Sequence, residues 1–294
     1  MFEKIIAFFM SIIAFFLGLF GLGGEEELNI QAFTDCAYGT HERQVVDFYL
    51  PEDASGDMSL VLLIHGGAWI AGDKSANTGA AQYCASDLGL AGATLNYRYL
   101  SEDVNMEDLV DDIDAALATV KAKAAEKGVN LNKVLLTGSS AGGHLSMLYA
   151  YSRKATAPIT PVAVVSNSGP TDLCDENFHV NNALGDLHQL FSHAAGIPVT
   201  AENRNSAVVK AALAKISPLY YVNSDTVPTI INHGAKDSIV PYSNAVSLDK
   251  ALTAFGVTHI FNTYPNSDHD LGDDKDVAKI ADKNLFEYVD AYLR

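Results

Sequence analysis

The sequence is short of positive charge and of cysteine. Of its 294 residues, 19 are lysine or arginine and 36 are aspartate or glutamate, so the formal net charge is −17. A field of that sign repels polyphosphates, and we therefore expect no nucleic-acid partner. The three cysteines, Cys36, Cys84 and Cys174, are widely separated and form no C-x-x-C pair. Their spacing predicts neither a disulfide framework nor a cysteine nucleophile.

Metal-ligand spacing, internal repeats and long Pro/Ser linkers are also missing. The nine histidines are spread along the chain without a Cys/His cluster, so we expect no metal site. Nothing in the composition divides the chain after its first 24 residues. Residues 25–294 are long enough for one large hydrophobic core, and we predict a single catalytic domain there.

Residues 1–24 differ from everything that follows them. Residues 5–22 are apolar apart from Ser11, Gly18 and Gly21 and contain no charge. Eighteen helical residues span about 27 Å, close to the roughly 30 Å hydrocarbon thickness of a bilayer. The run ends in G-L-G-G-E, a poor context for signal cleavage. We predict a signal anchor, with a cleaved signal peptide and a buried or interfacial helix as the alternatives.

The charges around this run predict its orientation. Lys4 precedes it, and no lysine or arginine follows it until Arg43. The positive-inside bias then keeps the N-terminus in the cytoplasm and places the catalytic domain on the other side. We therefore expect a membrane-anchored, extracytoplasmic domain, or a secreted one if the segment is cleaved.

The rest of the chain alternates strand-like and helix-like stretches, which is typical of an α/β fold with a mostly parallel central sheet flanked by helices. Residues 106–127 have apolar positions at helical spacing. Residues 175–217 are rich in His and Asn and show little periodicity, and we predict a small cap insertion there. Strands are expected at residues 45–50, 60–64, 92–95, 133–137, 162–165, 229–231 and 259–263.

The clearest chemical signal is G-S-S-A-G at residues 138–142, with Ser140 at its centre. It follows the predicted strand 133–137 and precedes a helix-compatible stretch, which is the strand–turn–helix context of a nucleophile elbow. Glycines are needed there because the sharp turn leaves no room for side chains beside the serine. Ser140 is the predicted nucleophile, whereas Ser139 does not fit the spacing.

A second signal is H-G-G-A-W at residues 65–69, directly after the predicted strand 60–64. A serine that cleaves an ester needs backbone N–H donors aimed at the developing oxyanion. In this arrangement they come from a glycine loop and from the residue after the nucleophile. We predict Gly67, Ala68 and Ala141 as these donors.

The acid and the base are expected in the order Ser, Asp, His along the chain. Asp237 follows the predicted strand 229–231, and His269 follows the predicted strand 259–263. Both loops leave the carboxyl edge of the sheet, where the elbow also lies. We predict His269 as the general base and Asp237 as its acid partner. The fallback acids are Asp225 and Asp270.

From about residue 45 onward the chain resembles the esterase/lipase group of α/β-hydrolases with an HGGxW loop. That group includes acetyl-xylan and feruloyl-type esterases and kynurenine formamidases. Ala68 stands where many lipase-like members have a third glycine, and its methyl group narrows the approach to the oxyanion. The matching segments are D-F-Y-L-P at 47–51, H-G-G-A-W at 65–69, N-Y-R at 96–98, G-S-S-A-G-G-H at 138–144, S-P-L at 217–219, H-G-A-K-D at 233–237 with V-P-Y at 240–242, and D-H-D-L at 268–271.

The resemblance implies the α/β-hydrolase fold and no cofactor. We expect a serine-dependent carboxylic ester hydrolase that acts through an acyl-enzyme on short acyl esters, including acetylated carbohydrate. An arylformamidase with the same triad is the first alternative. A non-catalytic binding protein on the same fold is the second. We expect His65, His144 and His233 to make structural hydrogen bonds, because none follows the last predicted strand.

Overall fold

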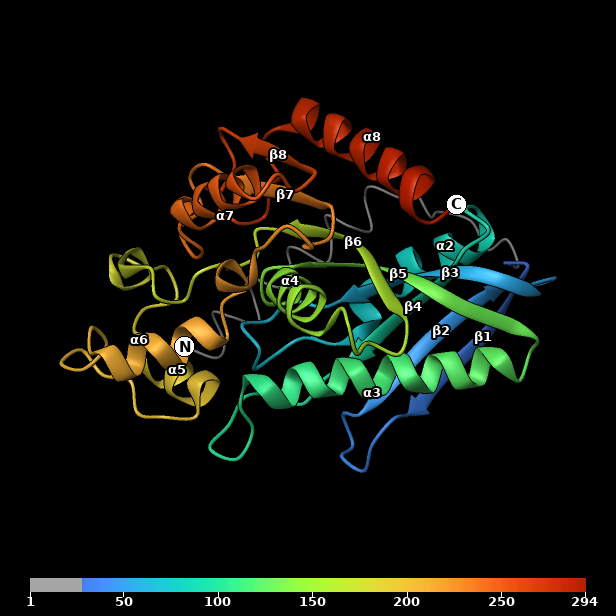
Figure 1. Ribbon diagram of the computed structural model, residues 1–294, viewed down its shortest axis with the longest axis horizontal. Helices are drawn as coiled ribbons and strands as arrows, with labels where there is room; N and C mark the ends of the chain where they lie inside the picture. Colours follow the sequence, from blue (N-terminus) through green and yellow to red (C-terminus); the bar gives the residue numbers. More distant parts are fainter. Residues whose placement is uncertain (1–27) are drawn as a thin grey trace.

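The computed structural model describes residues 28–294, so the predicted anchor at residues 1–24 lies outside the described part of the chain. The strands of this part form one sheet in the order β1-β2-β4-β3-β5-β6-β7-β8 (Figure 1). β2 pairs antiparallel with both β1 and β4, and every other neighbouring pair is parallel. The strands are β1 (Ile30–Ala37), β2 (Val45–Pro51), β3 (Gly56–Ile64), β4 (Ala91–Asn96), β5 (Val129–Ser139), β6 (Thr160–Asn167), β7 (Thr229–Gly234) and β8 (His259–Tyr264).

Helices cover both faces of this sheet, which explains why its central strands are apolar on both sides. Alternate residues of β5 enter two different cores: Val134 and Leu136 one, Leu135 the other. The first core is shared with α3, α4 and α7, and the second with α2 and α8 (Figure 1). These helices are α2 (Thr78–Ser86), α3 (Met106–Ala125), α4 (Ala141–Arg153), α7 (Tyr242–Ala254) and α8 (Lys275–Tyr292).

The predicted helix at residues 106–127 is α3, which ends two residues earlier than expected. Its N-terminus has a capping box: the Asn105 side chain accepts the N–H of Glu107, and the Asp108 carboxylate accepts the N–H of Asn105. These bonds satisfy N–H groups that have no partner within the helix. On the buried side, Asp112 accepts hydrogen bonds from Arg98, and this ties α3 to the chain leaving β4.

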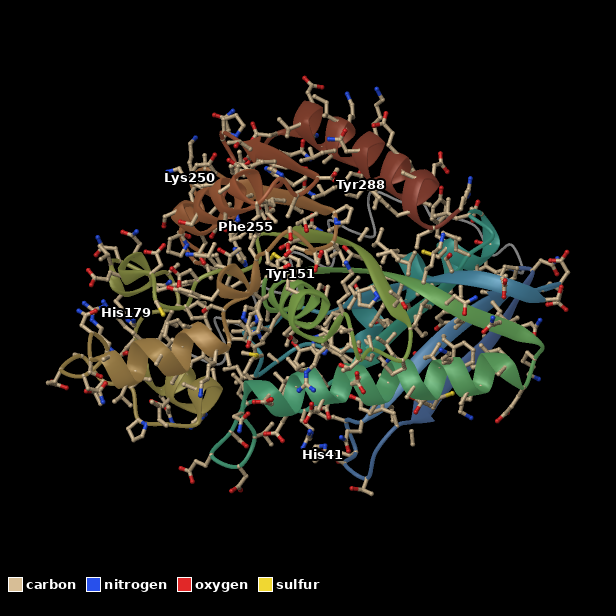
Figure 2. The ribbon with its side chains drawn as sticks, viewed as in Figure 1. His41, Tyr151, His179, Lys250, Phe255 and Tyr288 are labelled. Carbon is tan, nitrogen blue, oxygen red and sulfur yellow. The ribbon has the colours of Figure 1, made fainter. Side chains whose placement is uncertain are left out.

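The predicted cap region, residues 175–217, carries short helices between β6 and β7 and forms a lobe beside the sheet (Figure 1). His179 lies on this lobe and stacks on His188, with ring centroids 4.9 Å apart (Figure 2).

No helix within residues 28–294 is both long and apolar enough to cross a bilayer. The short elements are η2 (Glu176–His179), α5 (His188–Ala195), α6 (Ala207–Lys215) and, after them, η3 (Pro218–Tyr221); η1 (Lys74–Asn77) lies near the other end of the chain.

The mostly parallel sheet with helices on both faces confirms the predicted fold class. The strands that carry the predicted site residues lie next to one another in the order β3-β5-β6-β7-β8. Because these strands are parallel, their carboxyl ends share one edge of the sheet. The loops that contain Gly67, Ser140, Asp237 and His269 all start at that edge.

Candidate active site

Ser140 occupies a sharp turn between β5 and α4. Its backbone has φ 56° and ψ −121°, a conformation that costs free energy in a residue with a side chain. The Ser140 N–H donates to the Asn167 carbonyl at 2.8 Å, which anchors the turn to β6. A Cβ atom added at Gly138 or Gly142 would overlap the Ile64 carbonyl oxygen. The spacing of the motif is therefore set by backbone contact between the elbow and β3.

Asp237 and His269 form a buried pair beside this turn. His269 Nδ1 lies 2.8 Å from Asp237 Oδ2, and both side chains have 0% exposure. The other carboxylate oxygen, Oδ1, accepts the N–H groups of Ile239 and Val240 at 2.9 and 2.8 Å. Burial alone would raise the pKa of Asp237, but the interactions with His269 and His233 outweigh it and hold that pKa below its usual range. Asp237 is therefore an ionised acceptor for His269.

Short hydrogen bonds place the His269 loop next to the elbow. The Ser168 hydroxyl donates to the His269 carbonyl at 2.9 Å, and Ser168 directly follows Asn167, the residue that holds Ser140. The His269 N–H donates to the Asp268 carboxylate at 2.8 Å. The structure thus brings Ser140, Asp237 and His269 to one place at the edge of the sheet.

The loop after β3 adopts a backbone conformation that few L-residues adopt. Gly67, Ala68 and Trp69 have φ values of 118°, 49° and 60° in succession. The Gly67 carbonyl accepts the N–H groups of Ile70 and Ala71, and this closes the turn. Ala68 and Trp69 line a cavity of about 30 Å³ together with Ser140 and Ala141. Gly67 is not among the residues that line this cavity.

Aromatic and aliphatic side chains of the predicted cap region line one side of this small cavity. Phe178, Leu187 and Phe191 come from the segment between β6 and β7, and Ile239 follows Asp237. Phe178 and Phe191 meet edge to face at 5.6 Å between ring centroids, which is a favourable aromatic contact. The small cavity therefore offers a nucleophile at an apolar, tightly bounded position.

All three remaining buried histidines near the site contact a backbone carbonyl, as the sequence predicted; for His233 it is that of Val240, 3.0 Å from Nε2. His65 Nδ1 lies 2.7 Å from the Gly66 carbonyl oxygen, and His144 Nε2 lies 2.8 Å from that of Ile216. Burial lowers the pKa of His65 and that of His144 to about 4. His233 differs, because its ring also contacts Asp237. The contact between His233 and Asp237 was not predicted. The only signal for it in the sequence is that the two residues are four positions apart.

The fallback acids do not meet His269 through their carboxylates. Asp225 is exposed in the turn before β7, where its N–H donates to the Asn223 side chain. The carboxylate of Asp270, which is also exposed, accepts the N–H of Gly272. Among residues 28–294, no group of three or more His, Cys, Asp or Glu side chains is placed to hold a metal ion.

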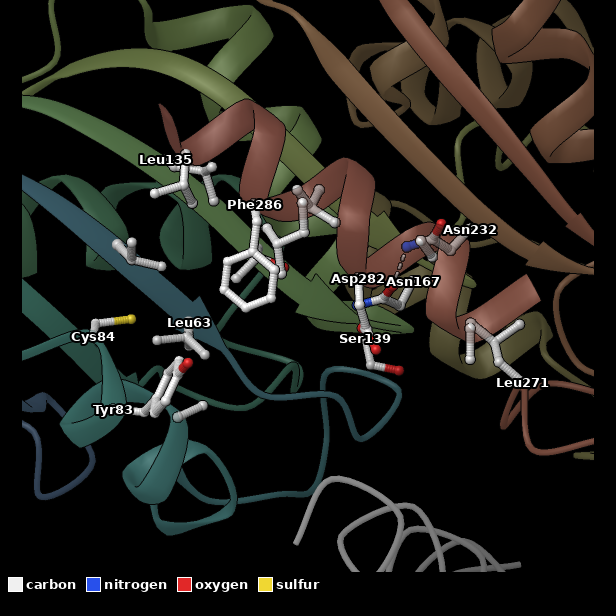
Figure 3. A pocket seen from close by; sticks show the side chains of 18 of the residues that line it. Leu63, Tyr83, Cys84, Leu135, Ser139, Asn167, Asn232, Leu271, Asp282 and Phe286 are labelled. Carbon is white, nitrogen blue, oxygen red and sulfur yellow. Dashed lines mark hydrogen bonds between the residues drawn. The ribbon is translucent and has the colours of Figure 1, made fainter. Parts of the chain in front are cut away.

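A larger cavity of about 390 Å³ lies on the other face of the sheet, between α2 and α8 (Figure 3). Ser139, Asn167 and His269 border it at the carboxyl edge of the strands. Asn232 donates to the Asn167 side chain at 2.8 Å, so the amides at this end are held in place. Away from that end the wall is mainly apolar, from Leu63, Cys84, Leu88, Leu135, Leu285, Phe286 and Val289.

Comparison with known proteins assigns the chain to a family. The BD-FAE family model matches residues 46–252, which is more than half of the sequence and includes Ser140 and Asp237. The chain belongs to the BD-FAE family. The matched range includes the loop after β3, the elbow and the acid loop, and it ends before His269.

Two relatives of this chain are named as ester hydrolases. The chain is 28% identical to the probable carboxylic ester hydrolase LipM of Mycobacterium tuberculosis over 72% of its own length and 49% of that protein. It is 27% identical to the esterase LipQ of the same organism, over 80% of its own length and 56% of LipQ. The chain thus spans about half the length of these relatives.

The structural match extends over nearly a whole solved chain. A truncated carbohydrate esterase from gut microbiota superposes with a TM-score of 0.67 at 22% identity, covering 90% of this chain and 99% of that one. At this level of identity the similarity establishes the fold, which is that of the α/β-hydrolases.

Proposed function

We propose that this chain is a serine-dependent carboxylic ester hydrolase that cleaves short acyl esters through an acyl-enzyme. The observation that carries the proposal is the fully buried Asp237–His269 pair, joined at 2.8 Å beside the strained Ser140 turn. A carboxylate that fixes one imidazole nitrogen leaves the other to act as a base toward a nearby hydroxyl. The names of the relatives LipM and LipQ support the same reaction class.

In the proposed reaction Ser140 Oγ attacks the ester carbonyl carbon while His269 Nε2 takes its proton. The oxyanion is held by backbone N–H groups from Ala141 and from the loop containing Gly67 and Ala68. Collapse of the tetrahedral species breaks the C–O bond, and His269 returns the proton to the leaving alcohol. Water then attacks the acyl-enzyme with the same base and releases the acid.

The preference for short acyl groups is supported by the small cavity beside Ser140. Its volume is about 30 Å³, against about 390 Å³ for the cavity on the other face, and its wall is aromatic and aliphatic, which favours a small apolar acyl group such as acetyl. Acetylated carbohydrate is the proposed natural substrate class, because a carbohydrate esterase from gut microbiota shares the fold over nearly its whole length.

Labelling and substrate profiling test the proposal together. A fluorophosphonate probe should label the wild-type protein but not Ser140→Ala, and p-nitrophenyl acetate should be hydrolysed. Absence of labelling would support a non-catalytic binding protein instead. Turnover of N-formylkynurenine far above that of any acetyl ester would replace the esterase with an arylformamidase that uses the same triad.

We also propose that residues 1–24 anchor the enzyme in a membrane, with the catalytic domain extracytoplasmic. The support is the uncharged apolar run at residues 5–22. Full-length protein should pellet with membranes and resist extraction with alkaline carbonate, whereas a chain starting at Glu25 should be soluble and active. Soluble full-length protein with an intact N-terminus would contradict the anchor.

A further inference from the structure

The acid of the proposed triad is bound by two histidines. Asp237 Oδ2 lies 2.8 Å from His269 Nδ1 and 3.2 Å from His233 Nε2. His233 belongs to β7 and has 0% side-chain exposure, as does Asp237. The two rings therefore approach the same carboxylate oxygen, one from the strand and one from the loop after β8.

The neighbours of His233 decide where its proton lies. Nε2 also lies 3.0 Å from the Val240 carbonyl oxygen, so both of its close partners are acceptors. Nε2 must therefore carry a hydrogen and donate it. Nδ1 is buried and has no hydrogen-bond partner among the described residues. Whatever the charge of the ring, the Nε2 hydrogen of His233 faces two acceptors, the Val240 carbonyl at 3.0 Å and Asp237 Oδ2 at 3.2 Å.

Both oxygens of the Asp237 carboxylate have close nitrogen neighbours. Oδ1 accepts two backbone N–H groups, and Oδ2 lies 2.8 Å from Nδ1 of His269 and 3.2 Å from Nε2 of His233. An ionised carboxyl group offers about four lone-pair positions; hydrogen bonds occupy three of them, and His233 Nε2 lies beside the fourth. This leaves the group one orientation, with Oδ2 directed at His269.

We propose that His233 is a positioning residue of this enzyme, which fixes Oδ2 of Asp237 against His269 and limits how strongly that oxygen attracts the His269 imidazolium. The inference rests on the proposed function, since it concerns the same triad. Three groups surround His233 from neighbouring elements. The Tyr242 ring of α7 lies 6.1 Å away between centroids, and the Asp237 carboxylate and the Val240 carbonyl face it from the loop after β7.

The direction of the effect follows from the charges. Loss of the His233 donor leaves more negative charge on Oδ2, and this favours protonated His269. If His233 is itself charged, its removal also relieves repulsion on His269, so the sign is the same. Because the base must be unprotonated, the acidic limb of the kcat/KM pH profile should move to higher pH.

Two substitutions at this position separate positioning from packing. His233→Leu keeps bulk but removes the donor, whereas the amide of His233→Gln can donate in place of Nε2. We expect His233→Leu to lower kcat for p-nitrophenyl acetate on the order of 10-fold with little change in KM, well short of the ~10⁴-fold loss when the triad acid itself is altered. His233→Gln should restore most of kcat and the wild-type pH limb.

His259→Gln is the matched control. His259 Nε2 lies 3.1 Å from Asp249 Oδ1, so this variant disrupts a His–Asp pair that has no contact with Asp237. It should leave kcat and the pH profile unchanged. Thermal unfolding of all three variants verifies that they remain folded at the assay temperature.

An NMR titration of the His269 ring tests the inference without turnover. The His269 midpoint should rise in His233→Leu and return in His233→Gln, even if no ester is hydrolysed, and this separates failure of the inference from failure of the proposed function. The inference is overturned if His233→Leu leaves the midpoint and the pH limb in place. It is also overturned if Leu and Gln lower kcat equally.

Discussion

The two cavities that border the triad differ in size and in the elements that form them. The small one, about 30 Å³, is lined by Ser140 and by aromatic side chains of the predicted cap region. The large one, about 390 Å³, is bordered by Ser139 and His269 and lies between α2 and α8 (Figure 3). In ester hydrolysis the acyl group stays on the serine and the alcohol leaves past the histidine. The contrast therefore favours a confined acyl group and a less confined alcohol.

The largest difference between the two cavities should appear when the serine of each is replaced and the losses in kcat are compared. Ser140→Ala removes the nucleophile and should lower kcat for p-nitrophenyl acetate at least ~10³-fold without unfolding the protein. Ser139→Ala changes only the border of the large cavity and should cost far less. Comparable losses in the two variants, measured at equal thermal stability, would mean that the elbow is misassigned.

Lengthening the acyl group should show how narrow the small cavity is. Each poorly accommodated methylene costs on the order of 1–3 kcal/mol in a confined pocket, so kcat/KM should fall steeply from acetyl to octanoyl esters of p-nitrophenol. Ala68→Gly should flatten that fall, because it removes a methyl group from the wall of this cavity.

The cap region can impose its own limit on chain length, and a second variant separates the two causes. Leu187→Ala opens the same cavity from the residue just before α5, where Leu187 is buried. If Leu187→Ala flattens the series and Ala68→Gly does not, the cap sets the limit. If kcat/KM of the wild-type protein does not fall with acyl chain length, the small cavity does not determine the acyl specificity.

Lengthening the alcohol should have the smallest effect. Among acetate esters from ethyl to octyl, kcat/KM should vary less than it does across the acyl series. Ala278→Leu partly fills the large cavity from α8. It should lower kcat/KM for octyl acetate by about 3-fold to 10-fold, on the order of 1 kcal/mol, and leave ethyl acetate unchanged. Equal effects on both esters would place the alcohol elsewhere.

Much of the fold could be predicted because its central strands are continuous apolar runs. The predicted strand at residues 60–64 is the buried end of β3, and the predicted strand at 133–137 lies within β5. The edge strand β1 was missed because it is only partly buried, and its register shifts between Phe33 and Cys36. Helix α2 has no clear apolar stripe, and its buried residues Ala81, Cys84 and Ala85 are small.

Chain order and strand context predict the candidate site, and in the structure His269 Nδ1 lies 2.8 Å from Asp237 Oδ2. What sequence reasoning could not supply was the second partner of the acid. His233 was grouped with His144 and His65 because it does not follow the last strand, yet its ring faces Asp237. Contacts of this kind depend on where a loop folds back, and residue spacing does not record that.

Gly142 has a consequence at the level of the gene. Its position touches the carbonyl groups of Ile64 and His65, so the elbow and the loop after β3 meet with no side chain between them. Every single-base missense change in a glycine codon introduces at least a methyl group, and here that group would collide with backbone that cannot rotate away. We therefore expect every single-base substitution that replaces Gly142 to disturb the elbow, even though Gly142 is not a member of the triad.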